Sequence, residues 1–107
     1  MNNINEMLQE IIKYHSTGNL KEAELLCRKI LTSEPDNPDA LHFFGVIAYN
    51  VGKYDIAKEY IGKAIERSPD TAACYNNMGN IYQVENNYTE SITWYKRTIE
   101  RDPQNKK

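Results

Sequence analysis

The stretch AIERSP at residues 64–69 decides the fold, because closely related stretches occur before and after it at a constant interval. They are ILTSEP at residues 30–35 and TIERDP at residues 98–103, so the closing prolines are 34 residues apart. A period of this length is typical of a repeated pair of helices. The chain therefore consists of three similar units.

Each unit has a turn residue at the same offset, namely Gly18, Gly52 or Asn86. Glycine adopts a left-handed backbone freely, and asparagine tolerates it better than most residues. Apolar residues at helical spacing surround each turn, as in YNNMGNIY at residues 75–82. The pattern predicts helices over residues 4–17, 20–33, 38–51, 54–67, 72–85 and 88–101.

The repeat predicts an all-α chain in which residues 1–107 form one domain. The aligned units span residues 4–37, 38–71 and 72–105. Gly45 and Gly79 lie within the apolar stripes of their helices, where the missing side chain lets the partner helix approach closely. We expect this packing to outweigh the cost of about 1 kcal/mol for glycine in a helix.

The units resemble the tetratricopeptide repeat, whose pattern is an aromatic residue, a Leu-Gly pair, a tyrosine and a late proline. The third unit carries related residues at Tyr75, Met78, Gly79, Tyr82, Ser91, Tyr95, Thr98 and Pro103. In the first unit, Glu10 and Ile11 stand in place of the Leu-Gly pair. The resemblance implies a right-handed α-solenoid of three repeats, with six antiparallel helices and a role in protein binding.

In arrays of stacked helix pairs, the first helix of each pair lines the concave face. On the first helix of each unit, a second row of residues lies beside the row that is predicted to be buried. This second row changes from apolar residues in the first unit to carboxamides in the third. Carboxamides both donate and accept hydrogen bonds, so they can pair with the backbone of an extended peptide. The predicted peptide-binding groove consists of Leu8, Ile12, His15, His42, Val46, Tyr49, Asn76, Asn77, Asn80 and Gln83.

Simpler interpretations exist for parts of this groove. Asn76 and Asn80 are expected to face solvent in the free protein, where they could serve only to keep the face hydrated. Leu8 and Ile12 also fit a role in the core or in packing at the end of the array.

Two resemblances within the repeat family bear on the ligand. In the repeats of O-linked N-acetylglucosamine transferases, an asparagine ladder on the inner face holds the substrate backbone. The equivalent positions in the three units of this chain are Gln9, Phe43 and Asn77, so only Asn77 matches the ladder. Co-chaperones of this family hold a terminal carboxylate with Lys, Arg and Asn, but the predicted groove contains no Lys or Arg. A carboxylate clamp is not expected.

The final predicted helix carries a second surface of interest. Tyr88, Ile92, Tyr95 and Ile99 follow one another at i, i+4, i+7 and i+11, and we call them the end face. The corresponding stripe of the second unit is expected to be covered by the first helix of the third. Burying such a side chain contributes roughly 1.5–3 kcal/mol. We therefore expect a further segment of a longer protein, or a second copy in a homo-oligomer, to cover the end face.

Composition excludes several classes of partner and location. A net charge of -2 gives no electrostatic attraction to nucleic acid or anionic lipid. No apolar run approaches the roughly 20 residues of a membrane span, and the start MNNINEML does not resemble a secretory signal. Cys27 and Cys74 are far apart, which indicates free thiols and a cytoplasmic location.

The sequence offers no catalytic, metal or cofactor site. His15 and His42 are its histidines, and the repeat predicts that they lie about two helical turns apart along neighbouring helices, whereas a metal site needs further ligands nearby. Cys74 lies near a helix start, where the pKa of a thiol can fall, but a neighbouring base is not evident. The glycines are scattered and form no phosphate loop.

The main hypothesis is a non-enzymatic module that binds a peptide or protein in its groove. An alternative is the amino-terminal, substrate-positioning part of a larger transferase, because the run from Ala23 to Ala57 resembles repeats of bacterial proteins that carry a glycosyltransferase, sulfotransferase or methyltransferase domain. A structural self-assembly unit is the third hypothesis.

Overall fold

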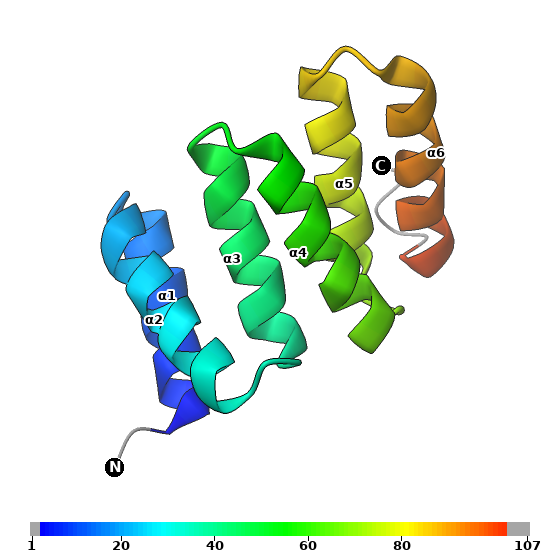
Figure 1. Ribbon diagram of the computed structural model, residues 1–107. Coiled ribbons are helices and arrows are strands. Elements are labelled where there is room, and N and C mark those ends of the chain that lie inside the picture. The colour runs from blue at the N-terminus through cyan, green and yellow to red at the C-terminus, as the bar shows by residue number, and fades with distance from the viewer. Residues whose placement is uncertain (1–2, 103–107) are drawn as a thin grey trace.

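The computed structural model describes residues 3–102, which form helices joined by short turns (Figure 1). The helices are α1 (Ile4–Ser16), α2 (Leu20–Ser33), α3 (Pro38–Asn50), α4 (Tyr54–Arg67), α5 (Ala72–Val84) and α6 (Tyr88–Arg101). Consecutive helices run in opposite directions and stack as three pairs along one axis (Figure 1). Within residues 3–102 there is no strand, so the predicted all-α class and α-solenoid arrangement are confirmed.

The predicted helix bounds are correct to one residue. The first helix of each pair ends one residue earlier than predicted, because Thr17, Val51 and Glu85 are the caps that follow it. The predicted turn residues all have a left-handed backbone, with φ of 80° at Gly18, 84° at Gly52 and 64° at Asn86. The repeat thus sets both the helices and the turns within each pair.

Two of the three first helices begin at a side-chain cap. The Asn37 side chain accepts a hydrogen bond from the Ala40 backbone N–H at 2.9 Å and so caps α3. The Asn3 side chain caps α1 in a similar way. Thr71 precedes α5 without a side-chain cap bond, and its hydroxyl lies 2.9 Å from that of Ser68 instead.

Close approach within the pairs depends on glycine, as predicted. A β-carbon added to Gly45 would lie 2.5 Å from Ile61 Cγ1 and 3.1 Å from the Ala57 carbonyl oxygen. At Gly79 it would lie 2.6 Å from Tyr95 Cε1. Real β-carbons do not approach this closely, so α3 can pack on α4, and α5 on α6, only because both positions lack a side chain.

Stacking between the pairs creates two buried cores, and α3 contributes to both. Ala40 and Ile47 of α3 pack with α2, and Phe44 covers them. α5, the first helix of the next pair, repeats this pattern on α4 with Cys74, Met78 and Ile81, which are buried in the second core. We call these two sets the covering stripes, because each has i, i+4, i+7 spacing and covers the pair before it.

The first helices lie on the more closely spaced side of the array. α1 contacts α3, and α3 contacts α5. Within residues 3–102, by contrast, α2 does not contact α4 and α4 does not contact α6. The array, with extents of 44 × 25 × 24 Å, is therefore curved, and its inner side is formed by α1, α3 and α5.

Candidate functional site

The ten residues predicted to form the groove all lie on the three inner helices. They occupy equivalent positions one repeat apart, so they form rows across the array. The rows are Leu8, His42 and Asn76, then Ile12, Val46 and Asn80, then His15, Tyr49 and Gln83, with Asn77 beside the first row. We call these ten the inner-face residues.

Two imidazole–amide pairs join neighbouring inner helices. His42 Nε2 lies 2.7 Å from Asn77 Nδ2, and His15 Nε2 lies 2.7 Å from Asn50 Nδ2. Because an amide nitrogen only donates, each imidazole Nε2 is the acceptor. Both histidines therefore connect adjacent repeats rather than standing alone at the edge of the groove.

Asn50 was not predicted as a site residue, although the sequence contains a signal for it. Each histidine is separated from its amide partner by 35 residues, which is one more than the repeat period. A search for polar pairs at this separation would have found both.

The environment of His42 favours the neutral imidazole. Burial lowers the pKa of His42, and the nearby Asp39 carboxylate opposes this shift only in part. The neutral ring can keep accepting from Asn77, whereas a protonated Nε2 could not. The floor of the inner face is thus uncharged at this point near neutral pH.

Acidification is expected to destabilise the fold through His42. Because its pKa is lower in the folded chain than in the unfolded chain, the unfolded state binds the proton more readily. The free energy of unfolding should therefore be highest above pH of about 6.5 and should fall as the pH decreases from there toward the folded pKa. Urea unfolding between neutral and mildly acidic pH measures this slope. In His42→Gln the slope should be shallower, and an identical slope in the variant would contradict the assignment.

The carboxyl end of the inner face differs from the prediction. Asn80 does not simply face solvent, because its Oδ1 accepts a hydrogen bond from the Tyr95 hydroxyl of α6. The same hydroxyl lies 2.9 Å from Gln83 Oε1. The expectation that Asn80 is fully hydrated in the free protein is therefore wrong, and the reason is that Tyr95 extends across Gly79 to reach it.

The apolar inner-face residues are buried to different degrees. Leu8 packs against the amino-terminal core, and the Tyr49 ring lies 5.9 Å from that of Tyr54. Ile12, in contrast, is 51% exposed. Core packing therefore accounts for Leu8 and part of Tyr49, and Ile12 is the large apolar side chain of this set that solvent reaches most.

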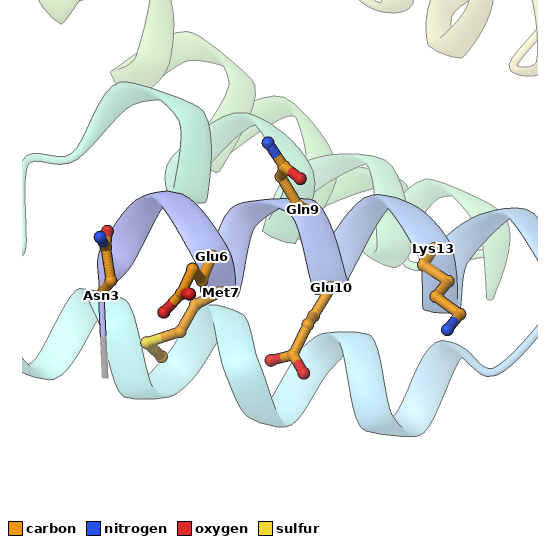
Figure 2. A pocket seen from close by; sticks show the side chains of 6 residues that line it. All are labelled: Asn3, Glu6, Met7, Gln9, Glu10 and Lys13. Carbon is orange, nitrogen blue, oxygen red and sulfur yellow. The ribbon is translucent and has the colours of Figure 1, made fainter. Parts of the chain in front are cut away.

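A hollow of about 500 Å³ lies outside the predicted groove, along α1. Figure 2 shows its lining residues, which are Asn3, Glu6, Met7, Gln9, Glu10 and Lys13. Gln9 points to the opposite side of the helix from Glu10 (Figure 2). Most of the lining is polar, which distinguishes this surface from the covering stripes of α3 and α5.

The end face is largely exposed. Tyr88, Ile92 and Ile99 are 58%, 54% and 36% exposed, whereas Tyr95 is half-buried because it packs on Gly79. Three of its four members are therefore available on the surface of α6.

Neither cysteine has the features of a reactive thiol. Cys27 and Cys74 are free and buried, and burial is the main cause that raises the pKa of Cys27 to about 12 and that of Cys74 to about 11. The sequence-based suggestion of a lowered pKa at Cys74 is wrong, because desolvation dominates over the nearby helix start.

No group of three or more His, Cys, Asp or Glu side chains in residues 3–102 is arranged to hold a metal ion. Across the same residues, every helix is too short or too polar to cross a membrane.

The family model described as anaphase-promoting complex, cyclosome, subunit 3 matches residues 16–98, most of the helical array. The chain belongs to this family of tetratricopeptide-repeat proteins. The match begins at the last residue of α1, includes all of α2, α3, α4 and α5, and ends within α6.

The relatives that this chain matches are much longer than the chain itself. The Sol locus transcriptional repressor of Clostridium acetobutylicum is 30% identical over 77 residues, which are 72% of this chain and 24% of that protein. The human cell division cycle protein 16 homolog is 25% identical over 108 residues, covering 92% of this chain and 17% of that protein. The chain thus spans a quarter or less of these relatives.

A solved structure confirms the arrangement of the tetratricopeptide repeats. An O-GlcNAc transferase mutant of Thermobaculum terrenum superposes with a TM-score of 0.90 and 25% identity, over 96% of this chain and 21% of that one.

Proposed function

We propose that this chain is an interaction module that binds an extended segment of a partner protein along the inner face of α1, α3 and α5. The observation that carries the proposal is the exposed Ile12, which lies on the same face as half-buried amides and imidazoles. An extended segment offers backbone N–H and C=O groups together with alternating side chains. The carboxamides would pair with the backbone groups of the segment, and Ile12 would contact one of its apolar side chains.

The charge of the inner-face residues suggests the chemistry of the ligand. The ten residues include no Lys, Arg, Asp or Glu, and the environment of His42 keeps it neutral. Residues without Lys, Arg, Asp or Glu give little electrostatic preference for a terminal carboxylate or a basic segment. We propose a ligand segment that is mainly uncharged, with apolar residues near α1 and backbone contacts near α5.

Two single substitutions are expected to weaken this binding while leaving the fold intact. Asn76→Ala should cost about 0.5–1.5 kcal/mol of binding free energy for a hydrogen bond removed. Ile12→Ser should weaken the apolar contact at the other end of the groove. Phage-displayed random peptides selected on the wild-type chain would be synthesised and titrated against each variant by fluorescence anisotropy.

The matched control is Thr93→Ala, an exposed position on α6 away from the inner helices. Circular dichroism and urea unfolding verify that each variant is folded. If selected peptides bind Ile12→Ser and Asn76→Ala as tightly as they bind the control, the inner face is not their site.

We also propose that the module acts without chemistry of its own, as one domain in a reducing compartment such as the cytoplasm. Support for a single domain comes from α3, which contributes to both cores. Support for the absence of thiol or imidazole chemistry comes from the buried thiols and from the histidines already paired with amides.

A second candidate is a segment that positions substrate for a transferase. The observation that favours it is the match at 25% identity to the O-GlcNAc transferase structure. An antibody raised against this chain would test it on an immunoblot of the native source. A native polypeptide much larger than 12.4 kDa with transferase activity would favour this candidate, and a band at that mass would exclude it.

A further inference from the structure

Two carboxamides of the inner face, Asn77 and Asn80, are each held at one end by another side chain. The Asn77 amide nitrogen donates to His42 Nε2 across 2.7 Å, and the Asn80 carbonyl oxygen accepts from the Tyr95 hydroxyl. Within residues 3–102, Asn77 Oδ1 and Asn80 Nδ2 have no hydrogen-bond partner. Asn77 therefore offers a ligand an acceptor, whereas Asn80 offers it a donor.

The surroundings of His42 keep the Asn77 amide in this orientation. Burial lowers the pKa of His42, so the ring is neutral and Nε2 can keep its lone pair. The Asp39 carboxylate acts on the ring from the same helix, and it favours the ring proton on Nδ1, the nitrogen closer to the backbone of α3. Nε2 can then only accept, so an inverted Asn77 amide would place two acceptors against each other.

The Tyr95 hydroxyl orients Asn80 in the opposite sense. A hydroxyl donates one hydrogen bond, and of the two carbonyl oxygens within reach Asn80 Oδ1 is nearer than Gln83 Oε1. The Tyr95 ring lies against Gly79, which holds the hydroxyl at the edge of the inner face. The carbonyl end of Asn80 is thus occupied, and its amide nitrogen remains for a ligand.

We propose that Asn77 and Asn80 together bind one extended residue of the partner segment, through its N–H and its C=O respectively. His42 and Tyr95 are the positioning residues that set this polarity. The inference rests on the proposed function, because it assigns backbone contacts in that same groove. Residues three apart on a helix have β-carbons about 5–6 Å apart, so the two amides are neighbours. In an extended chain the N–H and C=O of one residue point to the same side, as in a hydrogen-bonded pair of an antiparallel sheet.

This polarity limits which segments fit. The residue bound by the two amides must have an N–H, which excludes proline at that position. The direction of the segment is also fixed, because an N–H precedes the C=O of the same residue and the chain must pass Asn77 before Asn80. A segment in the opposite direction would bring its C=O to Asn77 Oδ1 and its N–H to Asn80 Nδ2, and both pairs would repel.

The first test uses the full chain without a ligand. Long-range proton–nitrogen NMR correlation spectra at neutral pH distinguish the two nitrogens of each imidazole, and the variant His15→Gln assigns the signals of His42. We expect the proton of His42 on Nδ1 and none on Nε2. A proton on Nε2 would overturn the assigned polarity, because Asn77 would then have to accept through Oδ1.

The second test compares two isosteric substitutions, with a phage-selected peptide that depends on Ile12 and Asn76 as the ligand. Asn77→Asp keeps an acceptor toward the ligand, whereas Asn80→Asp replaces the free donor by an acceptor. We expect Asn80→Asp to weaken binding about tenfold more than Asn77→Asp, the order of one lost hydrogen bond with repulsion between two acceptors. Both variants add the same charge within one turn of α5, so each is the control for the other.

The third test separates positioning by His42 from direct contact with the ligand. His42→Leu removes the acceptor for Asn77 and should weaken peptide binding about threefold, and this loss should disappear in the Asn77→Ala background. His42→Gln should bind more tightly than His42→Leu, because its Oε1 can accept from Asn77 in place of Nε2. A loss that persists in the Asn77→Ala background would overturn the positioning role.

The outcomes separate this inference from the proposed function. If no selected peptide depends on Ile12 or Asn76, the proposed function fails and this inference fails with it. If peptides depend on Ile12 and Asn76 but Asn77→Asp weakens binding as much as Asn80→Asp, or more, only the inferred polarity is overturned.

Discussion

Replacing Gly45 with leucine is expected to lower the free energy of unfolding by about 1–3 kcal/mol, and by more than the same change at Gly79. At Gly45 a new side chain meets Ile61 Cγ1 at 2.5 Å and two backbone atoms, Ala57 O and Ile61 N, at 3.1 Å. Backbone atoms cannot move aside without separating α3 from α4. At Gly79 the nearest atoms all belong to the Tyr95 side chain, which can move aside at the cost of its hydrogen bonds to Asn80 and Gln83.

Urea unfolding followed by circular dichroism measures the difference between the two variants. The control is Gly62→Ala, because a β-carbon added at Gly62 meets no atom within 4 Å. That change should raise stability by about 0.5–1 kcal/mol, the usual gain for alanine over glycine in a helix. Equal losses at Gly45 and Gly79 would mean that the backbone contact at Gly45 does not limit packing.

The second large effect is expected for Ile61→Ala, which should cost about 2–5 kcal/mol, as other isoleucine-to-alanine changes in cores do. Ile61 is fully buried and occupies the space that Gly45 leaves open. It also belongs to the core that includes the covering stripe of α5. One cavity at this position therefore weakens both the packing of α3 on α4 and the stacking of α5 on α4.

Two probes report this change at different places. Circular dichroism follows all helices, whereas fluorescence of Trp94, the single tryptophan, follows the third pair. The control Ile92→Ala removes an aliphatic side chain that is 54% exposed, and it should change stability by only about 0.5 kcal/mol. A loss at Ile61→Ala no larger than that of the control would contradict the central role of this residue.

Much of the fold could be predicted because the same helix and turn signals occur in each of the three units. The left-handed turns at Gly18, Gly52 and Asn86 depend on nearby residues, so the sequence pattern located all three. Close approach at Gly45 was also predictable, because a glycine within an apolar helical stripe destabilises the helix unless a neighbouring helix packs against it.

The candidate site was less accessible to sequence reasoning, because its details depend on how neighbouring helices are displaced. The pairing of His42 with Asn77 depends on a shift of one residue between adjacent repeats. The contact of Tyr95 with Asn80 depends on a ring that crosses Gly79 from the other helix of the pair. Neither arrangement follows from the helical periodicity of a single segment, which gives the face of a residue but not its partner.

The difference between the two ends of the array limits how these molecules can assemble. A head-to-tail filament requires that one end of each molecule complement the opposite end of the next. Here the apolar end face of α6 would meet Glu6, Glu10 and Lys13, which would lose water without gaining partners of opposite charge or shape. An exposed apolar end face therefore need not lead to open-ended growth of a filament.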